Sequence, residues 1–242
     1  MNNEELSALL ERRYATTQSR LGRFLLRLRV RQHQLRARWL AHGTEALKRT
    51  FDILVSFVLL VLLSPLFALI ALLVQLEDGG PVFFAQIRVG KFGREFKMYK
   101  IRSMCLDAEQ RLKELLDKNH HREGVTFKIK DDPRITRVGK WLRKFSFDEL
   151  PQLYNVLIGD MSLVGPRPPV PREVAKYSLA DRRRLAIKPG ITCFWQISGR
   201  SEIDFSGQVQ LDVNYIESQC LWTDFRILAR TVPAVLSGKG AC

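Results

Sequence analysis

The stretch VSFVLLVLLSPLFALIALLV, Val55 to Val74, is apolar enough to enter a lipid bilayer and contains Ser64-Pro65 near its middle. No charged residue occurs from Ile53 to Leu76. As one straight helix this run would be about 36 Å long, enough to cross a hydrocarbon core of about 30 Å. A proline inside a helix lacks the N–H donor and clashes with the preceding turn. Pro65 is therefore expected to kink the run into two arms, each reaching about halfway across a bilayer.

Basic residues flank this apolar run on both sides. Because Lys and Arg accumulate on the cytoplasmic side of membrane segments, both ends are expected to lie on that side. A re-entrant hairpin with Ser64-Pro65 at its tip satisfies this symmetry, and the Ser64 hydroxyl could bond a carbonyl freed by the proline. A kinked single span followed by a basic domain fits the residues equally well. The flanking cations are Arg36, Arg38, Lys48 and Arg49 before the run and Arg88, Lys91, Arg94, Lys97, Lys100 and Arg102 after it.

The composition fits a protein that works at a membrane surface. The 242 residues are 46% hydrophobic and can hold one soluble domain of about 150 to 170 residues beyond the membrane segment. The net charge is +14, which points to a polyanionic partner: anionic lipid, nucleotide phosphates or nucleic acid. The four cysteines have no C-x-x-C spacing, so neither a zinc site nor a disulfide framework is expected.

Residues 1–47 are expected to form a basic arm that precedes the membrane segment. Apolar residues at helical spacing between positions 18 and 41, with arginines around them, predict an amphipathic helix lying on the membrane surface. An oligomerisation helix, which could support a homodimer, and an unstructured basic tail are the alternatives. In the following KRTFD, Lys48 and Arg49 can reach headgroup phosphates, and Asp52 is expected to pair with one of them.

The remainder of the chain predicts an α/β (α+β) fold that is mainly helical. VFFAQIRV, GKFG and REFKMYKIRSM predict a β-hairpin, because two β-rich runs flank a glycine-containing turn. A surface helix is expected over 106–119, and a turn-rich segment then leads into a helix ending near Gly159. After the loop SLVGPRPPVPREV we expect a short basic helix, the loop KPGITCFWQISGR, and one last helix over about 212–236.

The chemistry is expected in SFDELPQL. Pro151 fits the first turn of a helix, which makes Asp148 the expected N-cap with Glu149 directly inside. The helix dipole would keep both carboxylates ionised, ready to act as nucleophile, metal ligand or base. Asp and Glu are also ordinary first-turn residues, and Ser146 with Glu149 matches a capping box.

Cations surround this acidic pair in the sequence. Arg143 precedes it and Arg167 follows it between two prolines. A carboxylate cannot approach phosphorus until the phosphate charge is neutralised, so this pattern indicates a site where Mg²⁺ and arginines hold a diphosphate. Arginine in a stiff loop provides bidentate phosphate recognition. GPRPP taken alone could equally be a structural turn with an exposed arginine, and the same holds for Arg200 in ISGR.

Taken together, the motifs resemble the bacterial sugar transferase family, the monotopic phosphoglycosyl transferases that begin exopolysaccharide, O-antigen or glycoprotein-glycan assembly. The resemblance runs from about Lys48 to Leu236. Residues 1 to 47 lie outside it. The motifs that bear it are KRTFD, LLSPLF, FFAQIRVGKFGREFKMYKIRSM, DDPRITRVGKWLRKFSFDELPQLYNVLIGDMSLVGPRPP, KPGITCFWQISGR and LDVNYIESQCLWTDFRIL.

The resemblance implies a specific reaction. Family members transfer a sugar 1-phosphate from a UDP-sugar to a polyprenyl phosphate such as undecaprenyl phosphate, and they release UMP. By this resemblance Asp148 attacks the sugar-bearing phosphate to form a phosphosugar-aspartyl intermediate, with Mg²⁺ bound at Asp148. Glu149 positions the nucleophile and metal or handles a proton. The implied phosphate-binding residues are Arg143, Arg167 and Arg200, with Lys100 and Arg102 as weaker candidates.

The resemblance also implies how the chain is organised. Family members use a re-entrant membrane helix broken at a Ser-Pro pair, so residues 48–76 are expected to enter the membrane and return at Ser64-Pro65. Residues 77–242 would then form a catalytic domain on the cytosolic face of the bacterial inner membrane. A nucleic-acid-binding protein would explain the charge but not the apolar run, and no nucleic-acid partner is expected. A non-catalytic basic membrane scaffold is the remaining alternative, but it leaves the acidic pair and its arginines as coincidence.

Overall fold

The computed structural model describes residues 21, 24–25, 27–32, 43–108, 110–111, 132–199 and 203–237. The chain divides into two compact units, residues 1–49 and 50–242. In the first unit, the described residues between positions 21 and 32 are helical and exposed, as predicted for this part of the arm. The rest of the helix expected over 18–41 and most of that expected over 106–119 lie outside the described residues.

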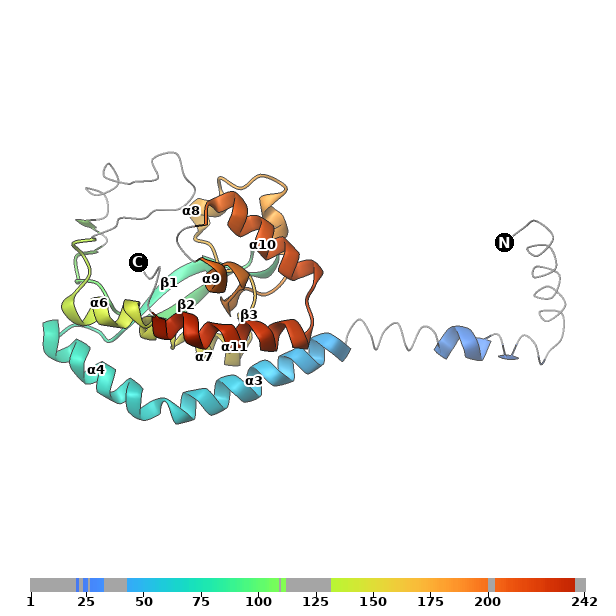
Figure 1. Cartoon of the computed structure of the whole chain (residues 1–242), viewed down its shortest axis with the longest axis horizontal. Coiled ribbons are helices and arrows are strands. Elements are labelled where there is room, and N and C mark those ends of the chain that lie inside the picture. The colour runs from blue at the N-terminus through green and yellow to red at the C-terminus, as the bar shows by residue number, and fades with distance from the viewer. Residues whose placement is uncertain are drawn as a thin grey trace. The chain divides into compact units, whose positions relative to one another are not determined.

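The described residues form helices and two small sheets, so the expected α/β fold, mainly helical with a β-hairpin, is confirmed. Figure 1 shows their arrangement. The α-helices are α3 (Thr44–Leu62), α4 (Ser64–Asp78), α6 (Arg137–Lys144), α7 (Gln152–Ile158), α8 (Pro171–Val174), α9 (Phe194–Ser198), α10 (Phe205–Glu217) and α11 (Leu221–Ser237). The strands are β1 (Phe83–Val89), β2 (Glu95–Ile101), β3 (Ser162–Val164) and β4 (Gly190–Thr192), and the 3₁₀ turns are η2 (Lys91–Gly93), η4 (Phe147–Glu149) and η5 (Asp181–Leu185).

The apolar run is kinked where the sequence predicts. Helices α3 and α4 meet at an angle of 58° at Leu63. The Ser64 hydroxyl donates to the Val61 carbonyl at 2.8 Å. In a regular helix that carbonyl would accept from position 65, where proline has no N–H. No single helix in the described part of the chain is long and apolar enough to cross a membrane, whereas this bent pair has the combined length and composition.

The end of α4 is fastened to the rest of the second unit by its two acidic residues. Glu77 accepts hydrogen bonds from the backbone N–H groups of Arg137 and Val138, which begin α6 and need such acceptors. Asp78 forms an ion pair with the buried Arg102, which follows β2. The end of α4 is therefore held beside α6, as Figure 1 shows.

The β-hairpin is confirmed. Strands β1 and β2 pair antiparallel, with Phe83 opposite Ile101 and Val89 opposite Glu95, and η2 supplies the turn. Strands β3 and β4 form a separate parallel pair. There the backbones approach so closely that a Cβ on Gly190 would lie 2.0 Å from the Gly165 nitrogen. Glycine is thus required beside the GPRPP loop.

The core joins the apolar run to the hairpin. Phe96 and Met98 of β2 pack with Val156 of α7 and Tyr215 of α10, and half-buried side chains of α3 pack against them. Asp52 of α3 is buried and accepts a hydrogen bond from the Leu163 N–H at 3.2 Å. Asp52 therefore fastens α3 to β3 through a buried backbone donor, which would otherwise be costly to leave unpaired.

The single last helix expected over 212–236 is wrong. The structure has two helices, α10 and α11, separated after Glu217. The Ser218 N–H bonds the carbonyls of Asn214 and Tyr215 to end α10, and the Tyr215 hydroxyl donates to the buried Asp224 at 2.6 Å. The expected helix ending near Gly159 is confirmed as α7, and the short basic helix is the 3₁₀ turn η5. PREV, expected in a loop, forms the short helix α8.

A buried ion pair holds η5 to α10 and supplies a stability prediction. Arg184 Nη2 lies 2.6 Å from Asp212 Oδ2, and both side chains are at least 95% buried. Burial raises the pKa of Asp212 to about 6 even beside the guanidinium. Arg184→Met, which leaves this carboxylate buried without its cation, is therefore expected to lower the free energy of unfolding by about 3 to 5 kcal/mol.

Unfolding in urea, followed by circular dichroism, measures the effect of Arg184→Met. The matched control is the neighbouring Arg183→Met, because Arg183 pairs with Glu217 at the same 2.6 Å but both groups are more than half exposed. An exposed pair contributes about 1 kcal/mol or less. Equal losses for the two variants would contradict the buried pair's role.

Candidate active site

Asp148 and Glu149 lie in η4, a separate 3₁₀ turn that precedes α7. The expected N-cap role of Asp148 is wrong: α7 begins at Gln152, with Pro151 in the N-cap position. The predicted capping box is also absent, because the Ser146 side chain makes no cap hydrogen bond. Ser146 instead adopts the left-handed conformation, with φ of 55°, and redirects the chain between α6 and η4. Such strained residues are enriched at functional sites.

Basic side chains from two other segments meet this acidic pair. Lys100 Nζ of β2 lies 2.9 Å from Glu149 Oε1 and 3.9 Å from Asp148 Oδ2. Arg167 Nη1, from the GPRPP loop, lies 3.3 Å from the same Glu149 oxygen. Glu149 is therefore the acceptor that holds both cations in place, and the Asp148 carboxylate lies beside them.

The two carboxylates differ in their protonation behaviour. Burial raises the pKa of Asp148, and the nearby Lys100 and Arg143 oppose that rise. Burial alone would also raise the pKa of Glu149, but Lys100 and Arg167 outweigh it and lower this pKa to about 2. Glu149 is therefore ionised at neutral pH because of its cations, not because of the helix dipole that the sequence indicates.

The structure brings most of the predicted phosphate-binding residues to this place. Arg143 of α6 donates to the Ser103 hydroxyl at 3.0 Å, and its charge acts on Asp148. Arg102, the other weaker candidate, forms an ion pair with Asp78 at the end of α4. Arg200 lies outside the described residues. Lys48 and Arg49 lie on α3, and Ser64 and Pro65 begin α4.

Asn155 is a positioning residue that the sequence does not indicate. Its side chain is fully buried and bonds the free edge of β2, accepting from the Tyr99 N–H at 3.0 Å and donating to the Lys97 carbonyl at 2.7 Å. These bonds fix α7 to β2 at Lys97 and Tyr99, just before Lys100. The amide thereby sets the distance between Lys100 and the η4 turn.

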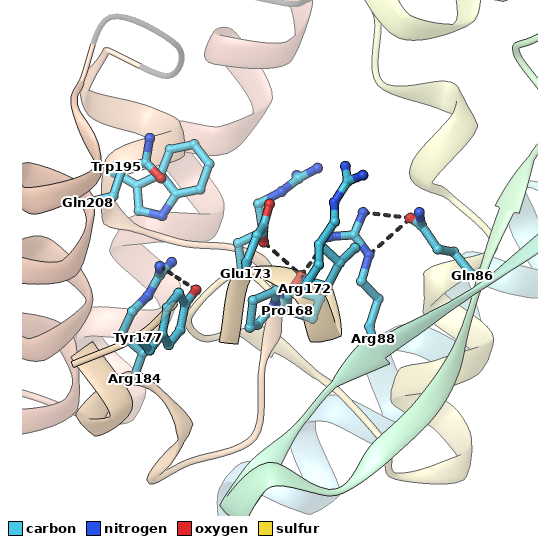
Figure 2. A pocket seen from close by; sticks show the side chains of 12 residues that line it. Gln86, Arg88, Pro168, Arg172, Glu173, Tyr177, Arg184, Trp195 and Gln208 are labelled. Carbon is cyan, nitrogen blue, oxygen red and sulfur yellow. Dashed lines mark hydrogen bonds between the residues drawn. The ribbon is translucent and has the colours of Figure 1, made fainter. Parts of the chain in front are cut away.

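Arg167 also lines a pocket of about 190 Å³. Figure 2 shows this pocket, with Arg88 and Gln86 on one side, Trp195 and Gln208 on the other, and α8 residues between them. Tyr177 and Arg184 close it. The acidic pair and the pocket therefore share a guanidinium. The lining residues are Gln86, Arg88, Arg167, Pro168, Pro169, Val170, Arg172, Glu173, Tyr177, Arg184, Trp195 and Gln208.

The pocket combines positive charge with an unused donor. Arg88 bonds Gln86 Oε1 at 2.7 Å and the Pro168 carbonyl at 2.9 Å. Burial, and to a smaller extent repulsion from Arg167, lowers the pKa of Arg88 to about 10. The Arg88 guanidinium therefore stays charged at neutral pH. The buried indole Nε1 of Trp195 has no hydrogen-bond partner within the described part of the chain. A pocket with these groups suits an anionic ligand that carries acceptor atoms.

Asp148 and Glu149 are the carboxylates of this site that a metal ion could use. No group of three or more His, Cys, Asp or Glu side chains gathers among the described residues. Mg²⁺ commonly binds through one or two carboxylates together with substrate phosphates. Asp148 fits such a shared site, because its Oδ2 is 3.9 Å from Lys100 while Glu149 is already engaged by two cations.

The arrangement has the parts needed for phosphoryl transfer. A buried carboxylate can act as a nucleophile, and Lys100, Arg143 and Arg167 can offset the negative charge of a diphosphate as bonds to phosphorus form and break. The cationic pocket beside Arg167 can hold the remainder of such a substrate. All of these groups come from the second unit of the chain.

Comparison with known proteins supports this chemistry. The sequence model described as bacterial sugar transferase matches residues 43–238. The chain is 56% identical over 166 residues to galactosyl transferase CpsE of Streptococcus agalactiae, covering 68% of this chain and 37% of that protein. It is 46% identical over 202 residues to undecaprenyl-phosphate galactose phosphotransferase of Salmonella typhimurium, covering 82% and 42%. It is 42% identical over 197 residues to exopolysaccharide production protein ExoY of Sinorhizobium fredii, covering 80% and 87%. The chain thus spans less than half of the first two relatives and most of the third.

Proposed function

Since this chain belongs to the bacterial sugar transferase family, we propose that it transfers a sugar 1-phosphate from a UDP-sugar to a polyprenyl phosphate such as undecaprenyl phosphate. UMP is the other product. The observation that supports this most strongly is the pair formed by the buried Asp148 and the half-buried Glu149, with Lys100 and Arg167 holding Glu149 beside a cationic pocket. The reaction would be the first membrane step of exopolysaccharide, O-antigen or glycan synthesis.

In the first half-reaction Asp148 is the nucleophile. One carboxylate oxygen attacks the sugar-bearing phosphorus of the UDP-sugar, and the bond from that phosphorus to the bridging oxygen breaks. UMP leaves with the bridging oxygen and its electron pair. The product is a mixed anhydride that joins the Asp148 carboxylate to the sugar phosphate.

In the second half-reaction the lipid phosphate regenerates the carboxylate. A phosphate oxygen of the polyprenyl phosphate attacks the same phosphorus, and the bond to Asp148 breaks. A polyprenyl diphosphate sugar forms, and the aspartate returns to its starting state. Two displacements at one phosphorus replace a direct encounter between two anionic substrates.

The basic side chains make this attack feasible. Lys100, next to both carboxylates, and Arg167, shared with the pocket, are placed to offset the diphosphate charge. Glu149 holds both cations and so keeps them from pairing fully with the nucleophile. The pocket with Arg88 and the unpartnered Trp195 Nε1 is the proposed place of the donor.

Mg²⁺ is the proposed metal. Asp148 would supply its protein ligand through the carboxylate oxygen that does not attack, and the donor's diphosphate would supply further oxygens. When bound, the ion would offset phosphate charge. No other protein ligand is needed for such a shared site.

The membrane placement follows from the two substrates. A water-soluble nucleotide sugar and a lipid phosphate meet only at the membrane surface. We therefore place α3 and α4 in the inner (cytoplasmic) membrane as a re-entrant hairpin with its tip at Ser64-Pro65, and the catalytic domain on the cytosolic face. The division into residues 1–47, 48–76 and 77–242, the interfacial role of the basic arm, and a homodimer remain predictions.

Chemical labelling tests this topology. In a cysteine-free background, Leu47→Cys and Pro81→Cys flank the bent pair, and both should react with a membrane-impermeant maleimide from the cytosolic side only. Each flank carries basic residues, which favour that side. Leu62→Cys beside the kink should be protected on both sides. Labelling of the two flanks from opposite sides would show a spanning helix instead.

Lipid-dependent UMP release tests the proposed reaction. Purified protein in nanodiscs is supplied with Mg²⁺, undecaprenyl phosphate and a panel of UDP-sugars: glucose, galactose and N-acetylhexosamines. We expect at most one UMP per protein without the lipid, and continued release that requires the lipid and favours one sugar. No release with any donor from folded protein would reject the enzyme and favour the scaffold alternative.

A further inference from the structure

A second cavity lies between the kinked apolar pair and the hairpin. Its volume is about 400 Å³, and its walls are apolar and aromatic. We call it the apolar groove. It is lined by Leu60 of α3, Phe67 of α4, Phe83 of β1, Tyr99 of β2, and Pro151 and Tyr154 at the start of α7.

The two ends of the apolar groove adjoin different parts of the protein. Leu60 and Phe67 stand about one helical turn before and after Ser64-Pro65, so this end belongs to the kink. At the other end, Tyr99 directly precedes Lys100, and Pro151 follows Glu149 by two residues. The lining of the apolar groove therefore includes residues of the apolar pair at one end and sequence neighbours of Lys100 and Glu149 at the other.

We propose that the apolar groove binds the isoprenyl chain of the polyprenyl phosphate next to its phosphate. This inference rests on the proposed function and names the place of its lipid substrate. The chain joins the phosphate through a single ester oxygen, so its first isoprene units must lie beside the reacting phosphorus. Lys100 provides a cation for the phosphate, and the apolar groove provides an apolar surface for what is attached to it.

The hairpin explains how two unlike substrates reach one carboxylate. Successive residues of a strand point to opposite faces. In β2, Lys100 contacts the acidic pair while its neighbour Tyr99 lines the apolar groove. In β1, Gln86 and Arg88 line the cationic pocket, whereas Phe83, offset from them by an odd number of residues, lines the apolar groove. The hairpin thereby separates a polar pocket for the donor from an apolar one for the lipid.

The residues of the apolar groove fit an ordered lipid chain. Tyr99 and Tyr154 pack edge to face, with ring centres 5.7 Å apart, and this fixes the aromatic wall. Tyr154 is 48% exposed and Phe83 is 56% exposed, although both are aromatic. Large exposed aromatic side chains around a cavity indicate a ligand that covers them.

Photocrosslinking identifies the occupant directly. The probe is a polyprenyl phosphate with a diazirine in its first isoprene unit, used with the full chain in nanodiscs. We expect labelling of Tyr154, Phe83 or Leu60 that an excess of undecaprenyl phosphate suppresses. Labelling elsewhere, or labelling of these residues that only bulk phospholipid suppresses, would overturn the proposal. This readout needs no turnover, so it stands apart from failure of the proposed reaction.

Kinetics of matched variants gives the second test. Tyr154→Ser removes an aromatic wall of the apolar groove, whereas Ile158→Ser, one turn later on α7 and 50% exposed, removes apolar surface outside it. Tyr154→Ser is expected to raise the KM for undecaprenyl phosphate about tenfold. It should leave lipid-independent UMP release, which reports the first half-reaction, unchanged. Ile158→Ser should change neither.

Two outcomes would overturn the apolar groove as the lipid site. One is an unchanged KM in both Tyr154→Ser and a second variant, Phe83→Ser. The other is an equal rise in KM for Tyr154→Ser and Ile158→Ser, which would show that bulk membrane contact, and not the apolar groove, delivers the lipid. Absence of any UMP release from the unaltered protein would instead reject the proposed reaction, and competed crosslinking in the apolar groove would still support the lipid site.

Discussion

Asp148→Asn is expected to reduce lipid-dependent UMP release by about 10⁴-fold or more, while the protein stays folded. The amide has nearly the shape of the carboxylate but is not a nucleophile, so the mixed anhydride cannot form. Asp148 is buried, and burial raises its pKa. A neutral side chain should therefore be tolerated there. Unfolding by circular dichroism checks that stability is kept or increased.

Asp160→Asn is the matched control for this substitution. It removes a carboxylate from the turn that follows α7, outside the ion pairs that Lys100 and Arg167 form with the acidic pair, and should leave UMP release within about twofold. Retention of more than about 1% of activity by Asp148→Asn would contradict the nucleophile assignment.

Lys100→Met is expected to have the second largest effect, a loss of about 10² to 10³-fold in turnover. Lys100 contacts both carboxylates, and of the nearby charges it lowers the pKa of Asp148 the most. Its removal should therefore raise this pKa further. Because the ionised aspartate is the nucleophile, activity appears as the pH rises through that pKa. The acid limb of the pH–rate profile should move to higher pH in the variant.

Lys97→Met supplies the control, since Lys97 lies in the same strand, is exposed, and contributes only its backbone carbonyl to Asn155. Its profile and turnover should match those of the unaltered protein. An acid limb that stays in place in Lys100→Met would show that a group other than Asp148 sets it.

The sequence predicts those elements that depend on residues close together in the chain. Ser64-Pro65 marks the kink because proline removes a donor wherever it stands in a helix, and the Ser64 hydroxyl bonds Val61 as expected. The hairpin follows from two β-rich runs and a glycine turn. The break between α10 and α11 was not predictable in the same way, because no glycine or proline marks it. The two helices are instead held by the buried hydrogen bond from Tyr215 to Asp224, a tertiary contact that a local sequence pattern does not indicate.

The residues of the site also fall into two groups, those close together in the sequence and those that only the fold brings together. The acidic pair and Arg143 lie within one short stretch, and proximity in sequence is enough to propose them. Their setting on a 3₁₀ turn depends on Ser146 in the left-handed conformation. The sequence does not indicate this conformation, because no glycine or asparagine stands there. Nothing local joins Arg88 to Trp195, although both line one pocket, because residues more than a hundred positions apart meet only through the fold. The alternation of Gln86 and Arg88 in β1 is the one signal that indicates a shared polar face.

The most direct test of the account is the mass of the intact protein after incubation with Mg²⁺ and the preferred UDP-sugar in the absence of lipid. The account predicts a mass increase equal to one sugar phosphate, one UMP released per protein, and a modified peptide in which Asp148 bears the adduct. Addition of undecaprenyl phosphate should remove the adduct. Lipid-dependent turnover without any adduct under rapid acid quench, or an adduct on another residue, would contradict the central claim that Asp148 carries the sugar phosphate.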